Sequence, residues 1–140
     1  MRAFRQWLRR CFGIGGVVGA EAPAAAGRGE LVEPRKALYL LAEALLAERM
    51  TLTEGCLRIC AVAGQLPDAE RFRAQYEAFY LVAAATAHLP ILDAWRALPP
   101  AEQRRLTRER LAVEARHREA VEAAARRLRD ALRREVYRLD

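Results

Sequence analysis

The side chains of this sequence best suited to chemistry are the cysteines and histidines, among them Cys56, Cys60, His88 and His117. Cys56 and Cys60 are four positions apart, so on a helix both thiols would share one face. With the two histidines they supply the ligand types of a tetrahedral zinc site. The C-x-x-C spacing typical of such sites is absent, and both cysteines follow the apolar pattern of their segment. We therefore expect packed thiols and assign no metal and no cofactor.

A second metal-binding pattern is the Glu-x-x-His sequence formed by Glu114 and His117. Bundles that hold two iron ions use two such motifs facing each other, and His88 has Ala85, not a glutamate, three positions earlier. We expect His117 to lie on the inner face of its helix as a hydrogen-bonded core residue. A metal-binding bundle remains an alternative interpretation.

Residue types also limit the enzyme classes open to this chain. Serine is absent, which excludes a Ser-His-Asp hydrolase, and no glycine-rich phosphate loop follows a strand pattern. A cysteine nucleophile would need a neighbouring histidine, which the sequence does not place. We predict that the chain is not an enzyme. Its odd cysteine count favours a reducing compartment, and we predict a cytoplasmic location, with peripheral attachment to the inner membrane as an alternative.

Eight residues form a candidate interaction or structural cluster. They are Glu54, Gly55, Cys56, Arg58, Trp95, Arg96, Glu114 and His117. Glu54 with Arg58, and Glu114 with Arg118, have the i, i+4 spacing of helix-supporting ion pairs.

Gly55 and Trp95 carry specific packing expectations. Glycine is unfavourable inside a helix, so Gly55 indicates close approach of another backbone, which we place near Trp95. We expect the Trp95 side chain to be buried and to close the core at the end of the bundle. The alternative is that Trp95 lies on the surface and anchors an interface.

The elements that must position these residues are helices, because Ala, Leu, Arg and Glu dominate the sequence. Leucines at 3,4 spacing predict a first helix over 34–49. Thr51 and Glu54 match a capping box and predict a second helix to about residue 65. Further helices are expected over 69–87 and, as one or two turns, within 90–98. A last helix over 100–138 would be roughly 58 Å long. The fold class is an all-α antiparallel bundle of about four helices, part of whose last helix overhangs the rest.

The N-terminal part differs from this helical domain, which we place at 34–140. Residues 1–33 form a basic tail and a Gly-, Ala- and Pro-rich linker, expected to be disordered or loosely ordered. Arginines before an apolar stretch resemble a signal peptide in outline. An amphipathic surface segment that includes Phe4 and Trp7 is another interpretation, and a frayed tail is the one we favour.

The net charge of +6 comes from 24 basic and 18 acidic residues. Within 99–140, acidic and basic side chains alternate, which is typical of a solvated, ion-paired helix face. The arginines of this segment could also contact phosphates. We treat a peripheral membrane or nucleic-acid binder as the alternative function, although no DNA-recognition motif is present.

Three stretches, taken in order, carry a resemblance to a known family. They begin at Leu52 (LTEGCLRI), Pro90 (PILDAWRAL) and Glu109 (ERLAVEARHREA). Over about residues 35–130 the chain resembles the bacterial domain of unknown function 2489. The resemblance implies an all-helical fold and supplies no reaction, substrate or catalytic residue. Members of that family often carry an N-terminal membrane anchor, and this chain departs from them because its N-terminal segment is short and glycine-rich.

The function predicted from the sequence is a non-enzymatic protein-protein interaction module. It would bind another protein or self-associate through the long C-terminal helix, because that helix is longer than the bundle that can cover it. The sequence indicates no small-molecule substrate.

Overall fold

The computed structural model describes residues 33–138, which are helical throughout apart from short connections. The helices are α3 (Pro34–Leu46), α4 (Leu52–Ala63), α5 (Ala69–Gln75), α6 (Glu77–Ala85), α7 (Leu92–Arg96) and α8 (Pro100–Arg138). No strand occurs among the described residues. The expected tail and its alternative interpretations fall on residues 1–32, outside the described part of the chain.

Both ends of α3 are set by local backbone chemistry. Pro34 occupies its first turn, where the missing amide hydrogen of proline costs nothing. After the helix, the amide of Glu48 donates to the Leu45 carbonyl at 3.1 Å and the amide of Arg49 to the Ala44 carbonyl at 3.0 Å. Glu48 adopts a left-handed φ of 57°. This is the Schellman arrangement, in which glycine is the preferred residue at the left-handed position.

The third predicted helix is wrong as a single element, because the chain breaks it into α5 and α6 at Tyr76. Tyr76 has φ −121° and ψ 49°, outside the helical region. Its buried ring packs 4.7 Å from that of Phe72 and 6.1 Å from that of Phe79, centroid to centroid. No glycine or proline marks the break in sequence, so tertiary packing overrides local propensity here.

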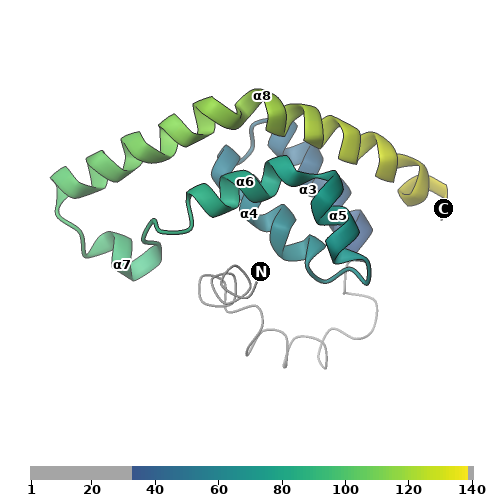
Figure 1. The fold of residues 1–140 in the computed structure, drawn as a ribbon, viewed down its shortest axis with the longest axis horizontal. Helices are drawn as coiled ribbons and strands as arrows, with labels where there is room; N and C mark the ends of the chain where they lie inside the picture. The colour runs from purple at the N-terminus through teal and green to yellow at the C-terminus, as the bar shows by residue number, and fades with distance from the viewer. Residues whose placement is uncertain (1–32, 139–140) are drawn as a thin grey trace.

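The core lies where α8 crosses the other helices. α8 packs against α3, α4 and α6, and Figure 1 shows these helices grouped beneath one part of it. The opposite end of α8, together with α7, projects beyond this group. The predicted overhang of the long helix is therefore present, and it is the N-terminal end of α8 that projects.

The buried face of α8 differs in part from the predicted stripe. Leu106, Val113, Ala124, Leu128 and Leu132 are buried as expected. Ala120 and Ala131 are exposed instead, and Val121 and Ala125 take the corresponding buried positions. Alanine is common on several faces of this helix, so apolar periodicity alone does not fix its rotation.

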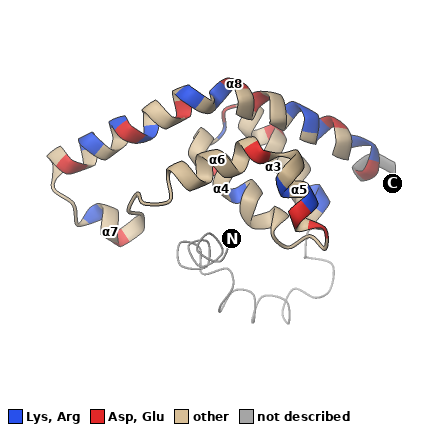
Figure 2. Cartoon of the chain, viewed as in Figure 1, with Lys and Arg blue, Asp and Glu red and all other residues tan. Residues whose placement is uncertain are grey.

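Charged side chains of both signs follow α8 along its length (Figure 2). Several form pairs one turn apart, such as Arg118 Nη1 with Glu122 Oε2 at 3.9 Å. None of the described helices combines the length and apolar character needed to cross a membrane.

Candidate interaction groove and its buried anchor

An open apolar groove of about 990 Å³ lies beside α4. One side is formed by α3 and α4, through side chains that include Leu40, Leu41, Leu57, Ala61 and Val62. The other side comes from the segment after α6, from α7 and from the start of α8, through Leu89, Ile91, Leu92, Trp95 and Leu106. We call this surface the α4 groove.

Two leucines that line the α4 groove are unusually exposed. Leu40 keeps 50 % and Leu92 keeps 69 % of its surface in contact with solvent. Single exposed apolar residues are common on proteins, but these two share one concave surface with other apolar side chains. Together they extend the apolar lining of the groove to the solvent-exposed surface.

A buried carboxylate anchors the start of α4 beside the groove. Glu114 of α8 is only 3 % exposed. It accepts hydrogen bonds from the Thr53 amide at 3.1 Å and from the Thr53 hydroxyl at 2.7 Å. Arg110 Nη1 donates to the same carboxylate oxygen at 2.7 Å. The first amides of a helix lack partners within the helix, so Glu114 caps α4 from a different helix.

This environment keeps Glu114 ionised. Burial by itself would raise the pKa of Glu114, but the side-chain and backbone hydrogen bonds from Thr53, together with the Arg110 cation, lower the pKa below its usual value. A negative charge at a helix N-terminus also interacts favourably with the helix dipole. The anchor therefore combines hydrogen bonding, ion pairing and dipole stabilisation at one buried point.

The predicted cap and ion pair of α4 are largely confirmed. Thr51 Oγ1 accepts from the Glu54 amide at 3.1 Å, as in a capping box. The Glu54 carboxylate accepts from Arg58 Nη2 at 2.7 Å, one turn along the helix and not back at the cap. Glu54 and Arg58 both line the α4 groove, where their opposite charges neutralise each other. The predicted pair of Glu114 with Arg118 is wrong, because Thr53 and Arg110 hold Glu114.

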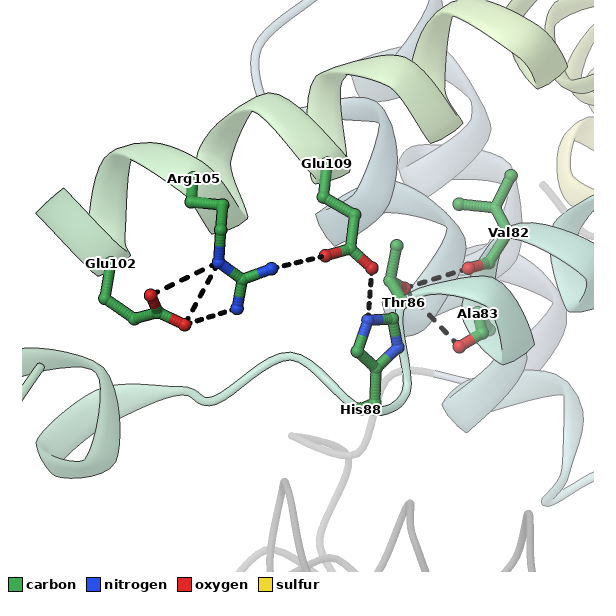
Figure 3. Close-up of polar contacts among 7 residues, drawn as sticks. All are labelled: Val82, Ala83, Thr86, His88, Glu102, Arg105 and Glu109. Carbon is green, nitrogen blue, oxygen red and sulfur yellow. Dashed lines mark hydrogen bonds and ion pairs between the residues drawn. The ribbon is translucent and has the colours of Figure 1, made fainter.

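The segment between α6 and α7 is held to the end of α6 by one hydrogen bond and to α8 by another. The buried Thr86 hydroxyl donates to the Val82 carbonyl at 2.8 Å. Two residues later, His88 Nε2 lies 2.5 Å from Glu109 Oε1 of α8. These contacts set the path by which the chain leaves α6 and reaches the α4 groove (Figure 3).

The Glu109 contact belongs to a row of charged side chains on the projecting end of α8. Arg105 Nη1 lies 4.0 Å from Glu109 Oε2, and Arg105 also forms a close ion pair with Glu102. Figure 3 shows these side chains following one another along the helix toward His88. The row is exposed, so it orients surface groups and contributes little stability.

The cysteines and histidines considered as metal ligands lie in different surroundings. Cys56 and Cys60 are buried free thiols. Burial raises the pKa of Cys56 to about 12, and burial raises that of Cys60 as well, so neither thiol ionises readily. His88 is exposed at the surface, and His117 is half-buried on α8. In the described range, no three potential ligand side chains are grouped closely enough to hold a metal ion.

The expectations for Gly55 and Trp95 need correction. A Cβ at Gly55 would lie 2.6 Å from Leu45 Cδ1 of α3, so the close neighbour is the side chain of Leu45 and not a backbone near Trp95. Trp95 is half-buried and lines the α4 groove, because α7 has no buried residue and lies too far out to plug the core. Arg96 is exposed and pairs loosely with Asp93, at 3.7 Å.

Several residues of the groove and its anchor could not be predicted from the sequence. Thr53 and Arg110 showed no sequence signal, because Thr53 meets Glu114 across 61 positions of chain. Leu40 and Leu92 lie outside the apolar spacing that predicts the buried helix faces. That position, an apolar residue outside the spacing of the buried ones, is the one sequence signal that could have indicated them.

Comparison with known proteins identifies one family. No curated protein and no solved structure matches this chain. A family described as protein of unknown function (DUF2489) matches residues 28–128. That range includes α3 to α7 and most of α8, and with them the α4 groove and the Glu114 anchor. The chain therefore belongs to the DUF2489 family of proteins of unknown function.

Proposed function

We propose that this chain is a helical protein-interaction module without catalytic activity, and that the α4 groove is its protein-binding surface. The observation that carries the proposal is the groove itself, with a volume of about 990 Å³ and a mainly aliphatic lining. Leu40 and Leu92 are half exposed or more in the free chain. Covering such a surface is favourable by roughly 25 cal/mol for each Å² of apolar area removed from water.

The length of the α4 groove suits a helical segment of a protein. Glu54, Leu57, Arg58, Ala61 and Val62 of α4 line it at the 3,4 spacing of one helix face. The nine residues from Glu54 to Val62 span roughly 13 Å, which is about two and a half turns. Amphipathic helices bind to grooves of this kind through apolar residues at similar spacing.

The charged side chains that line the groove are each paired with an opposite charge. Glu54 is paired with Arg58, and Arg110 is paired with Glu114. A catalytic group must be available to a substrate, so these pairs favour a binding surface over an active site.

Site-specific photo-crosslinking in cells tests the proposal. A photoreactive amino acid replaces Ala61 in the groove, and the control probe replaces Ala74, an exposed residue of α5. We expect the probe at position 61 to give protein adducts that disappear when Leu57→Glu is also introduced. The control probe at position 74 should give none of these adducts. Circular dichroism of each purified variant checks that it is folded. Equal adducts at both positions, or adducts indifferent to Leu57→Glu, would contradict the proposal.

A further inference from the structure

A short stretch of the sequence, outside the described part of the chain, has the pattern of a groove-binding helix. On a helix with about 3.6 residues per turn, its apolar side chains fall within one arc of roughly 140°, and its arginines fall on the opposite side. The apolar members are Phe4, Trp7, Leu8, Cys11 and Phe12, and the arginines are Arg2, Arg5, Arg9 and Arg10. The first four apolar members have the i, i+3, i+4, i+7 spacing with which amphipathic helices bind to apolar grooves. We call residues 4–12 the 4–12 segment.

The 4–12 segment matches the α4 groove in length and in chemical character. Its nine residues would span roughly 13 Å as a helix, and the groove-lining face of α4 from Glu54 to Val62 has the same length. Phenylalanine and tryptophan side chains each bury about 150–250 Å², and the groove offers them a volume of about 990 Å³ between aliphatic walls. Aromatic rings in this groove would cover the exposed Leu40 and Leu92.

The chain connects the 4–12 segment to one wall of the groove. Residues 13–33 separate the segment from Pro34, where α3 begins. Ala37 and Leu40 line the groove and lie within the first two turns of α3. A glycine-rich stretch of 21 residues spans on average about 25 Å, so the segment can reach the groove of its own chain. A tether of this kind gives an effective concentration on the order of millimolar, which is an advantage over any untethered partner.

The charges of the segment and of the groove are compatible with this docking. With the apolar arc turned into the groove, the arginines on its opposite side point toward solvent. In the groove, Glu54 is already paired with Arg58, and Arg110 is paired with Glu114. The docked segment therefore buries no unpaired charge, which would be costly.

We propose that the 4–12 segment binds to the α4 groove of its own chain as an amphipathic helix and competes there with the partner protein. This inference rests on the proposed function, because it takes the groove as a helix-binding surface, and it adds a regulator of that surface. The groove supplies the apolar surface that the amphipathic pattern of residues 4–12 lacks when the sequence is considered alone. Release of the segment opens the groove to a partner.

Photo-crosslinking of the purified full chain tests the contact. With the photoreactive residue at position 61, we expect an adduct to residues 4–12 of the same molecule, identified by peptide mass spectrometry of the 15.8 kDa species. Trp7→Glu should lower its yield roughly tenfold or more, because it places a charge against apolar walls. Gln6→Glu is the matched control, since it adds the same charge on the opposite face of the helix. No adduct, an adduct indifferent to Trp7→Glu, or an adduct found only between two molecules would overturn the proposal.

Tryptophan fluorescence gives a second measurement of the contact, because Trp7 and Trp95 are the only tryptophans of the sequence. In a Trp95→Phe background, we expect the blue-shifted emission of a buried Trp7, and a red shift when Leu57→Glu is added. Leu111→Glu should leave the emission unchanged, because Leu111 is 51 % exposed on α8 and does not line the groove. Emission of a solvated Trp7 that shifts to the blue only when anionic vesicles are added would assign the segment to a membrane surface and overturn the proposal.

Crosslinking in cells separates this inference from the proposed function. Trp7→Glu should raise the yield of Leu57-dependent adducts between position 61 and other proteins, because the groove is then open, while Gln6→Glu should not. Circular dichroism checks that each variant is folded. Leu57-dependent adducts whose yield ignores Trp7→Glu would overturn the competition and leave the proposed function standing. Absence of adducts to any other protein, even with Trp7→Glu, would overturn the proposed function and the competition together.

Discussion

The carboxylate of Glu114 caps α4 through Thr53, although 61 positions separate the two residues. Both the amide and the hydroxyl of Thr53 donate to one oxygen of that carboxylate. The contact fixes the start of α4 against the middle of α8, and therefore holds the wall of the α4 groove in place.

Removing the Glu114 carboxylate should destabilise the fold markedly. Glu114→Ala leaves the amide and hydroxyl of Thr53 buried without their acceptor, and we expect a loss of about 2–3 kcal/mol in the free energy of unfolding. Urea denaturation measures the loss. Glu119→Ala is the matched control, because Glu119 is exposed on the same helix and should change stability by less than about 0.5 kcal/mol. Equal effects of the two substitutions would refute the anchor.

The same carboxylate should make stability depend on pH. The pKa of Glu114 is lowered in the folded chain, so its contribution is fully present above the unfolded-state pKa, for which the ordinary value is 4.5. The contribution is lost as the pH falls through the lower, folded-state value. Denaturation of the original chain and of Glu114→Gln at several pH values measures this. The difference in their unfolding free energies should shrink in acid, and a constant difference would argue against an ionised anchor.

Gly55 should be coupled energetically to Leu45. Gly55→Leu places a side chain where Leu45 Cδ1 already lies, and we expect a loss of about 1–3 kcal/mol from overpacking. In a Leu45→Ala background the same substitution should cost less, because the space is then open. A double-mutant cycle from thermal or urea melts gives the coupling. Additive effects would show that Gly55 is not packed against Leu45.

Glu48 offers a site where the chain can be stabilised. Its left-handed φ of 57° closes α3 and suits glycine better than glutamate. Glu48→Gly should raise the free energy of unfolding by up to about 1 kcal/mol. Glu43→Gly, in the interior of the same helix, should lower it instead. Thermal melts measure both, and a loss of stability in the first variant would count against the assigned cap.

The thiols of Cys56 and Cys60 should be protected in the folded chain. Both are buried and burial raises their pKa values, while thiol reagents attack the thiolate. Alkylation at pH 8 followed by peptide mass spectrometry should label both residues in denaturant and neither without it. Rapid labelling of the native chain would contradict the packing described.

Local rules explain how far the sequence predicts this structure. Pro34 and the cap at Thr51 locate helix starts correctly, because proline and threonine act on the backbone next to them. The break at Tyr76 has no such signal, since it follows from rings that meet only in the folded chain. The α4 groove is hidden for the same reason. Leu57 and Leu92 become one surface only when α4, α7 and α8 are assembled.

In the proposed function, protein covers the α4 groove. The most direct measurement is the yield of protein adducts from a photoreactive residue at position 61 in cells, compared between the original chain and Leu57→Glu. We expect a clear set of adducts that vanishes with the substitution, although the substituted protein remains folded. Adducts of equal yield in both chains, or none in either, would contradict it.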